Sequence, residues 1–382
     1  MNTKSDLLSK NWFLVCYHSL DTSMIGGLRI SRLSRYLSDK GIKVNLITRE
    51  SYTDTLESIT IIPEKKIVQR NKRLFNLITP PDSSAIWSLS VFKFLRKKKP
   101  GVILTTVPPF GIVFVGLLLR LFRSRHYWVA DFRDPWFLNP VYKPAFYWYK
   151  RIVAYILESI VFKTADLVIL NTFKDQENYI KKYPFLKSKS LVVRNGFDEK
   201  IENRARKINT HETIRMVYSG TAYQGGIATI NVAAFLNKLN NAGLSIICDY
   251  YGEYHPSIEL SPFIEYKGRV PQDQIPKILS YYKLGLIYLQ EVCIGGGRVT
   301  QKFYDYLGSG VSPIVLNPSQ EMSTGMRALN FGLEVYPDSP IENIITYIQS
   351  SYFSEQSALP ENAIKPYTRE YQFEKLFNSF ID

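Results

Sequence analysis

The sequence predicts an α/β protein of two domains, each built on a mostly parallel β-sheet covered by helices. Three observations lead to this prediction. The chain has 382 residues, more than one compact core usually holds. Short runs rich in β-branched and aromatic residues alternate with longer helical patterns, which is typical of parallel α/β layers. The alternation is interrupted by a polar, charged stretch at residues 198–212 and then starts again.

The first half contains six short apolar runs that we interpret as strands. A helix is expected at residues 28–40, where Gly41 ends it, and an apolar helix at 110–119 after Pro108 and Pro109. The predicted strands are residues 12–18, 44–48, 102–106, 126–131, 167–171 and 191–194.

The second half repeats this organisation with five predicted strands. Helices are expected at residues 227–240, between Pro271 and Tyr282, and at 299–307. The predicted strands are residues 214–219, 244–250, 264–267, 284–289 and 312–316.

The positive charge of the chain is confined to its first half. Residues 1–200 carry 33 Lys and Arg against 16 Asp and Glu, and residues 201–382 carry 15 against 18, so the halves contribute +17 and −3 to the net charge of +14. Such asymmetry indicates an anionic partner, which is a membrane surface, a nucleic acid or a phosphorylated substrate. The alternative is a solvated basic surface that serves solubility.

Cysteine usage and apolar segments indicate a cytoplasmic protein. The three cysteines form no CxxC pair, so a disulfide framework or a zinc site is not expected. We find no secretory signal at the amino terminus. The apolar run at residues 110–119 is about half the ~20 residues that a membrane span needs.

The clearest candidate binding site is Gly295-Gly296-Gly297-Arg298, which follows a predicted strand and opens a helix. Glycines let backbone N–H groups approach an anion, and the helix N-terminus adds partial positive charge. Lys302 adds a full charge within the first turn, and Asp305, on the same helix face, can accept hydrogen bonds from a ribose diol. Taken alone, the segment is equally compatible with a flexible loop before an ordinary amphipathic helix.

Two further loops strengthen the interpretation that a nucleotide binds the second half. One follows its first strand, and the other follows a strand of the same sheet. Ligands of open α/β sheets bind outside the carboxyl ends of strands, so these loops are expected to converge with the glycine loop. Their residues are Tyr218, Gly220 and Thr221 in the first, and Gly268, Arg269 and Val270 in the second.

In the first half, two segments at strand ends are candidates. Gly26 and Gly27, with Arg29, follow the first strand, either as a ligand-binding turn or as a simple βα turn. The segment at residues 131–136 places Asp131, Arg133 and Asp134 at a strand end, as expected for acid/base or hydrogen-bonding groups. An ion pair between Arg133 and an aspartate that holds the loop is the structural alternative.

Nothing in the sequence points to a resident metal. No Asp-x-Asp triplet occurs, and the four histidines are scattered along the chain. A single Asp-x-x-Asp pair is weak support for a cation site. We therefore expect no metal and no cofactor.

Taken together, these motifs resemble the GT-B glycosyltransferases, most closely glycosyltransferase family 4 and its bacterial members that build cell-surface polysaccharides. The resemblance spans almost the whole chain. The residues that carry it are Gly26-Gly27 with Arg29, residues 131–136, Arg194-Asn195-Gly196-Phe197-Asp198, Tyr218-Ser219-Gly220, Gly268-Arg269-Val270 and residues 302–310.

The resemblance implies two Rossmann-like domains facing a central cleft. Residues 1–200 would form the acceptor-side domain, residues 201–365 the nucleotide-sugar-binding domain, and residues 366–382 a helix that crosses back to the first domain. Gly26 and Gly27 would border the donor phosphates and the acceptor, with Asn195 and Arg133 on the same side.

The resemblance also implies roles in the second domain. Lys302 would contact the donor diphosphate, Asp305 would replace the glutamate that binds the ribose, and Val270 would contact the base. The chain departs from the family pattern at Gly297, where members often carry a glutamate. A first-domain histidine near the reacting sugar is also replaced, and Asp134, with Asp131 second, is the candidate catalytic residue.

The expected function is retaining transfer of a sugar from a nucleotide-sugar donor to a lipid-linked or glycan acceptor at the inner face of the membrane. The basic residues 96–99, 120, 123 and 125, beside Trp87, Phe92, Phe94 and the 110–119 run, are expected to dock on anionic lipid. A nucleotide-sugar epimerase of the same fold is the first alternative. A nucleic-acid-binding protein is the second alternative. The sequence contains no recognisable nucleic-acid-binding motif, so no nucleic-acid partner is expected.

Overall fold

The structure, a computed structural model, describes residues 4–18, 25–50, 58–71, 81–139, 148–198, 200, 213–221, 226–354 and 359–381. It divides into two compact units, Met1–Arg194 with Gln372–Asp382, and Asn195–Tyr371. The unit boundary precedes the domain boundary predicted at residue 200. Most of the charged stretch predicted as a linker lies outside the described residues.

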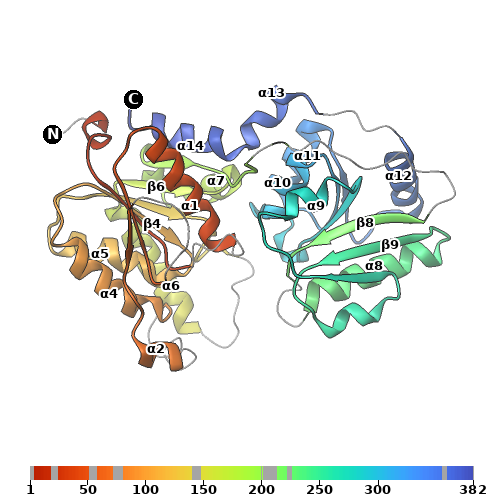
Figure 1. The fold of residues 1–382 in the computed structure, drawn as a ribbon, viewed down its shortest axis with the longest axis horizontal. Coiled ribbons are helices and arrows are strands. Elements are labelled where there is room, and N and C mark those ends of the chain that lie inside the picture. Colours follow the sequence, from red (N-terminus) through yellow and green to blue (C-terminus); the bar gives the residue numbers. More distant parts are fainter. Residues whose placement is uncertain are drawn as a thin grey trace. The chain divides into compact units, whose positions relative to one another are not determined.

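The first unit is built on a seven-stranded parallel sheet with the strand order β3-β2-β1-β4-β5-β6-β7 (Figure 1). Helices cover both faces, so the central strands are continuous apolar runs. The strands are β1 (Trp12–Val15), β2 (Val44–Thr48), β3 (Ile59–Ile61), β4 (Val102–Val107), β5 (Tyr127–Phe132), β6 (Leu167–Leu170) and β7 (Ser190–Val192).

Successive residues of β1 point to opposite faces and supply two hydrophobic cores. Phe13 and Val15 pack under the helices α4 (Ser84–Leu95), α5 (Val113–Leu121), α6 (Trp148–Thr164) and α7 (Phe173–Lys182). Trp12 and Leu14 pack under α1 (Ile25–Asp39) and the final helix α14 (Arg369–Asn378). The shorter elements are η1 (Lys4–Leu7), α2 (Lys66–Arg70), η2 (Phe110–Ile112) and η3 (Pro184–Ser188).

The second unit contains a six-stranded parallel sheet with the order β10-β9-β8-β11-β12-β13 (Figure 1). Its strands are β8 (Ile214–Ser219), β9 (Ile246–Tyr251), β10 (Ile264–Gly268), β11 (Leu284–Tyr288), β12 (Ser312–Leu316) and β13 (Leu333–Val335).

Helices again cover both faces of this sheet. Met216 and Tyr218 of β8 point into the core under α8 (Ile227–Asn241) and α12 (Ile341–Phe353). Val217 points to the core under α9 (Ile275–Leu279), α10 (Gln301–Gly308) and α11 (Gln320–Leu329). The shorter elements are η5 (Pro256–Leu260), η6 (Glu291–Cys293), α13 (Glu361–Ile364) and η7 (Lys365–Tyr367).

The predicted fold class is confirmed, because two parallel sheets with helices on both faces are present. Three strands, β2, β8 and β12, have the bounds that the sequence predicts. The predicted 110–119 helix is η2 followed by α5. The elements that were not predicted are the helices α2, α4, α6, α7, α11, α12 and α13 and the edge strands β3 and β13. In each unit the parallel order brings the carboxyl ends of all strands to one edge, where loops form ligand sites in such folds.

Candidate active site

Two glycines shape the carboxyl edge of the second sheet. Gly220 follows β8 with φ +133°, a conformation that essentially only glycine adopts. Its N–H donates to the carbonyl of Tyr251 (2.8 Å), and its own carbonyl accepts a 3.0 Å bond from the Tyr250 hydroxyl. A Cβ at Gly252 would lie 1.9 Å from the Gly220 carbonyl oxygen. The loops after β8 and β9 therefore approach each other more closely than a side chain at position 252 would allow.

Lys302 reaches this glycine edge from the first turn of α10. Its Nζ lies 2.6 Å from the position of a Cβ built on Gly220, and 5.1 Å from the ring centre of Tyr218. The Tyr218 hydroxyl in turn donates to the carbonyl of Thr221 (3.3 Å). The structure thus brings Tyr218, Gly220, Thr221 and Lys302 together, as the sequence predicts for the strand-end loop and the helix.

The glycine loop before α10 is fixed to the start of α11. Gly295 has φ +80°, and the N–H of Gly296 donates to the carbonyl of Cys293 (3.0 Å). The Ser319 hydroxyl, which caps α11 by accepting from a backbone N–H, donates to the carbonyl of Arg298 (2.6 Å). Gly297 is buried, and the Arg298 side chain is half-buried. The loop is therefore an ordered connection between the starts of two helices.

Asp305 is buried on α10, and both of its carboxylate oxygens are oriented by amides. Gln301 Nε2 donates to Oδ1 (2.8 Å), and Gln272 Nε2 donates to Oδ2 (2.9 Å). Gln301 also donates to the carbonyl of Gly196 (3.0 Å). Burial raises the pKa of Asp305, and its hydrogen bond from Gln301 opposes this shift. Each oxygen keeps a further acceptor position, because a carboxylate oxygen accepts about two bonds.

The remaining residues predicted from the second half, Arg269, Val270 and Asn195, are exposed or half-buried. Arg269 is exposed and forms a 3.4 Å ion pair with Glu253, while Val270 packs against the α10 side of the core. The carbonyl of Gly268 accepts from the N–H of Gly252 (3.0 Å), which links the loops after β9 and β10. Asn195 is half-buried at the first residue of this unit.

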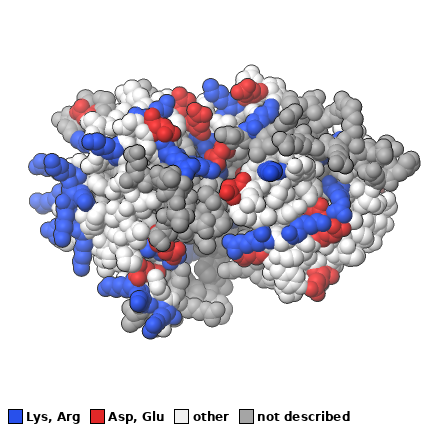
Figure 2. Space-filling model, in the orientation of Figure 1, with Lys and Arg blue, Asp and Glu red and all other residues white. Residues whose placement is uncertain are grey.

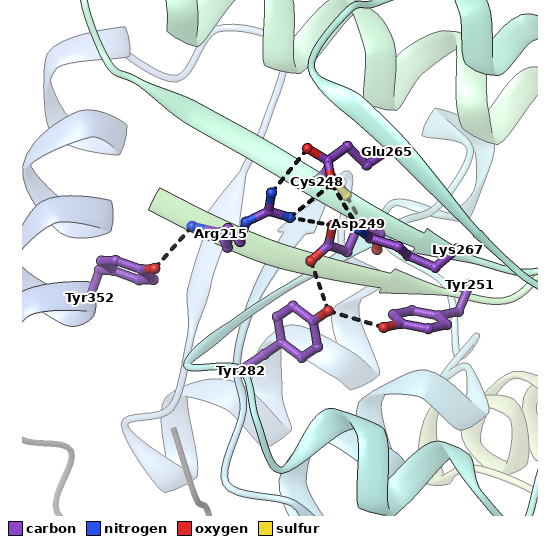
Figure 3. A network of polar contacts seen from close by, with 8 residues as sticks. All are labelled: Arg215, Cys248, Asp249, Tyr251, Glu265, Lys267, Tyr282 and Tyr352. Atoms are coloured by element: carbon purple, nitrogen blue, oxygen red, sulfur yellow. Dashed lines mark hydrogen bonds and ion pairs between the residues drawn. The ribbon is translucent and has the colours of Figure 1, made fainter. Parts of the chain in front are cut away.

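A polar network across β8, β9 and β10 was not predicted from the sequence (Figure 3). Arg215 donates to Asp249 (2.7 Å) and Glu265 (2.9 Å), and Lys267 pairs with Glu265 (2.7 Å). The hydrogen bond from Arg215, with that from Lys267, lowers the pKa of Glu265 to about 2. Tyr282 donates to Asp249 Oδ2 (2.8 Å). The network fixes the register of the three strands whose ends carry the glycine loops. Arg215, a charged residue inside the apolar run of β8, was the signal in the sequence that could have indicated it.

In the first unit, Arg29 and Asp131 form a buried ion pair. The guanidinium of Arg29, near the start of α1, donates to both Asp131 oxygens, at 3.2 and 3.3 Å. It also donates to the carbonyls of Val193 (2.9 Å) and Arg194 (3.1 Å). Asp131 is 1% exposed and accepts from Thr106 as well (2.9 Å). The pair links α1 to β5, to β4 through Thr106, and to the segment that follows β7.

The alternative pair between Arg133 and an aspartate is replaced by this arrangement. Arg133 donates to the backbone carbonyls of Val107 (3.4 Å) and Pro108 (2.5 Å) at the end of β4. The half-buried Asp134 follows it, and among the described residues no hydrogen bond or ion pair engages its carboxylate. Asp131 is therefore committed to Arg29, whereas Asp134 is the available carboxylate of this segment.

His18, which the sequence analysis set aside as scattered, lies at the same edge. Its Nε2 is 3.2 Å from the carbonyl oxygen of Pro108, the oxygen that also accepts from Arg133. The ends of β1, β4 and β5 thus bring His18, Pro108 and Arg133 together. Gly27, in the first turn of α1, and Arg29 are both buried, and Gly26 directly precedes Gly27. Residues 19–24, between β1 and α1, lie outside the described residues.

A buried glutamate supports the loop that carries Asp134. Glu158 of α6 is fully buried and accepts from the N–H of Phe137 (2.9 Å) and the hydroxyl of Tyr179 (2.7 Å). Tyr179 in turn accepts from the N–H of Trp136 (3.0 Å). Burial raises the pKa of Glu158 to about 7, against the hydrogen bonds from Phe137 and Tyr179. The contact joins segments 21 residues or more apart, so it could not be predicted from local sequence pattern.

Among the residues that the structure describes, metal-binding groups are not concentrated at either edge. Within the described ranges, no cluster of three or more His, Cys, Asp or Glu side chains has an arrangement that would hold a metal ion.

The first half of the chain is similar in sequence to a known enzyme family. Residues 27–200 match the sequence model of Glycosyltransferase Family 4. No curated protein matches the chain by sequence.

Solved structures with the same fold cover nearly the whole chain. A glycosyltransferase from Rickettsia africae ESF-5 is 11% identical, with 97% of this chain and 98% of that chain covered at a TM-score of 0.64. The lipopolysaccharide outer core galactosyltransferase WaaB is 12% identical, with 97% and 99% covered and a TM-score of 0.64. MnaA from S. aureus, solved with UDP, is 12% identical, with 97% and 95% covered and a TM-score of 0.58. The fold is GT-B, and with the family match it makes the protein a glycosyltransferase.

Proposed function

We propose that this glycosyltransferase moves a sugar from a nucleoside-diphosphate sugar to a lipid-linked or glycan acceptor in cell-surface polysaccharide synthesis, with retention of anomeric configuration. The observation that carries the proposal is the approach of Lys302 to Gly220. It places an ammonium group at a strand end where the backbone is bare of side chains. Positive charge together with close backbone access is a combination that favours binding of a diphosphate.

The donor site that we propose in the second unit is formed by the residues that the sequence predicts. Lys302, Arg298 and the N-terminus of α10 compensate the diphosphate, whose negative charge grows as the sugar leaves. Asp305, oriented by its two glutamine amides, accepts from the ribose hydroxyls. The segment Gly268–Val270 borders the base, and the glycine loop at 295–297 admits the phosphates. The structure of MnaA with UDP shows that this fold accommodates such a nucleotide.

On the acceptor side we assign the reactive carboxylate to Asp134. Asp131 is the weaker candidate because its oxygens are occupied by Arg29 and Thr106. Gly26, Gly27 and Arg133 of the first unit would border the acceptor. The reaction as proposed needs no metal ion, since the cationic side chains carry the charge compensation.

The basic first half supports action at the cytoplasmic face of an anionic membrane. Among the described residues, no helix has the length and apolar character needed to span a bilayer. A lipid-linked acceptor would therefore be met by a protein that docks on the membrane surface, held by the +17 excess of residues 1–200.

A thermal-shift series with UDP, GDP, TDP and CMP tests the donor assignment. A nucleotide at a hundredfold excess over its Kd stabilises the protein by about 2.7 kcal/mol, so the correct one raises Tm clearly. Lys302→Ala should abolish this shift and reduce transfer by about 10²–10³-fold. An unchanged Tm with all four nucleotides, or wild-type transfer in Lys302→Ala, would refute the donor site. Epimer formation without acceptor would instead identify the protein as an epimerase.

A further inference from the structure

Helix α6 carries a line of apolar side chains on its outer face. Trp148, Ile152, Ile156 and Ile160 recur every four residues, so they lie along one stripe of the helix, and Tyr155 lies beside it. Their exposed fractions run from 41% to 71%, whereas Ala154, Val161 and Phe162 of the same helix are buried in the core. Single exposed apolar residues are common, but four aligned ones with a fifth beside them indicate an interaction surface.

The apolar stripe continues onto the end of α5. Arg120 of α5 donates to the carbonyl of Thr164 (3.1 Å), which fixes the end of α6 beside the end of α5. There Leu121 is 73% exposed and Phe122 is 51% exposed. The guanidinium of Arg96 lies 5.0 Å from the ring centre of Phe122, which brings the end of α4 to the same place. The exposed side chains of α5 and α6 thus belong to one side of the first unit, the side covered by α4, α5 and α6.

Exposed cations lie beside this surface at the ends of α4 and α5, and its sequence contains few acids. Residues 83–164 contain thirteen Lys and Arg but only Asp131, Asp134 and Glu158 as acids, and none of these three is exposed. In Figure 2, Lys and Arg side chains gather at the left edge, over the ends of α4 and α5. The exposed cations there are Lys93, Arg96, Lys97, Lys98, Lys99, Arg123 and Arg125.

The apolar residues that the sequence suggested for lipid docking do not form this surface. Trp87 and Phe92 are 2% and 7% exposed and belong to the core under α4 and α5. The run at residues 110–119 is likewise mostly buried. The exposed apolar groups are instead those of α6 and of the α5 terminus.

We infer that the α6 stripe, Trp148, Ile152, Tyr155, Ile156 and Ile160, with Leu121 and Phe122, is the face with which the protein docks on a bilayer of anionic phospholipids. The inference rests on the proposed function, of which it names the membrane partner surface. Apolar and aromatic side chains enter the boundary between headgroups and acyl chains, while the cations of α4 and α5 contact lipid phosphates. A second copy of the chain fits poorly, because it would bring two cation-rich surfaces together.

Co-sedimentation with lipid vesicles tests the surface. Vesicles of phosphatidylcholine with phosphatidylglycerol should bind the wild-type protein at low salt, and pure phosphatidylcholine vesicles should bind it at least tenfold more weakly. The variant Ile152→Gln/Ile156→Gln/Ile160→Gln should lose at least tenfold in binding to the anionic vesicles. Glutamine is a good helix former, so the substitutions remove the apolar surface and leave α6 intact. The charge reversal Lys97→Glu/Lys99→Glu should weaken the same binding.

A matched control carries the same number of substitutions on exposed apolar residues of the second unit. Ile230→Gln/Leu260→Gln/Val292→Gln, at residues that are 42%, 59% and 51% exposed, should bind vesicles as the wild type does. Binding of the α6 variant at the wild-type level, or equal binding of the wild type to both vesicles, would overturn the inference. So would a wild-type dimer in size-exclusion chromatography that the α6 variant dissociates, because a second copy would then occupy the face.

Transfer to a soluble acceptor analogue separates the docking surface from the enzyme. The α6 variant should retain wild-type transfer to such an analogue and lose transfer to vesicle-embedded acceptor. Loss of transfer to both acceptors, with an unchanged Tm, would show that α6 acts in the reaction and would contradict its role as a docking surface. A wild-type protein that binds anionic vesicles but transfers no sugar would refute the proposed function alone.

Discussion

Arg29 holds Asp131 through two hydrogen bonds of 3.2 and 3.3 Å, although 102 residues separate them in the chain. Both side chains are buried, at 6% and 1% exposure. Removing one partner of a buried pair leaves the other charge uncompensated, and such changes typically cost about 3–5 kcal/mol. The main role of the pair is therefore to stabilise the folded first unit.

We predict that Asp131→Asn and Asp134→Asn separate stability from activity. Asp131→Asn should lower the free energy of unfolding by about 3 kcal/mol, measured by urea denaturation. Asp134→Asn should leave that free energy within about 0.5 kcal/mol of the wild type, since its carboxylate has no partner among the described residues, and should reduce kcat by about 10²–10⁴-fold.

The opposite pattern would reassign the roles. A stable Asp131→Asn protein without activity would make Asp131 the reactive carboxylate. A fully active Asp134→Asn enzyme would remove Asp134 from the mechanism and direct attention to His18, which lies at the same edge.

Glu158 gives the stability of the first unit a defined pH dependence. Burial raises its pKa from 4.5 to about 7, so between these values the folded protein holds a proton that the unfolded chain has released. The stability from this proton is full below about pH 4.5, falls as pH rises, and is absent above about pH 7. The total change is on the order of 3 kcal/mol.

Glu158→Gln should remove this contribution. The glutamine oxygen can accept the bonds from Phe137 and Tyr179, and a neutral amide has no proton to lose in this range. The free energy of unfolding, measured from pH 5 to pH 8, should therefore fall more steeply in the wild type than in the variant. Because the loop of Asp134 depends on the contact, the variant should also flatten the alkaline limb of the kcat profile. Parallel stability profiles for the two proteins would contradict the assignment.

The sequence predicted what depends on local pattern and parallel topology. Strands at residues 44–48, 214–219 and 312–316 are short runs rich in apolar residues, and the structure places them there. Lys302 and Gly220 could be expected to meet, because a parallel sheet brings the loop after β8 and the start of α10 to the same edge.

What the sequence did not predict depends on contacts between distant segments. The pairing of Asp131 with Arg29 rather than Arg133 requires the position of α1 beside β5. The apolar spacing of Ile152, Ile156 and Ile160 is the spacing of a buried helix face, and only the packing of α6 shows that it points outward. The contact of Glu158 with Tyr179 likewise needs α6 and α7 side by side.

The geometry at Gly220 yields the sharpest test of the donor site. In Gly220→Ala the new Cβ would lie 2.6 Å from the Nζ of Lys302, so the ammonium group must move away from the strand end. The backbone is also strained, at φ +133°, by about 1–3 kcal/mol. We expect UDP, or whichever nucleotide stabilises the wild type, to bind at least tenfold more weakly, measured by calorimetry.

Gly243→Ala separates strain from displacement of Lys302. Gly243 has φ +89°, and a Cβ there meets no atom within 4 Å, so this variant carries a similar backbone strain without any clash. Both variants should lose stability, but only Gly220→Ala should lose nucleotide affinity. Because Lys302 is a flexible side chain, an unchanged affinity in Gly220→Ala would mean that the ammonium group reaches the diphosphate from a position away from the strand end. Equal losses of affinity in both variants would mean that general destabilisation, and not the Lys302 contact, controls binding.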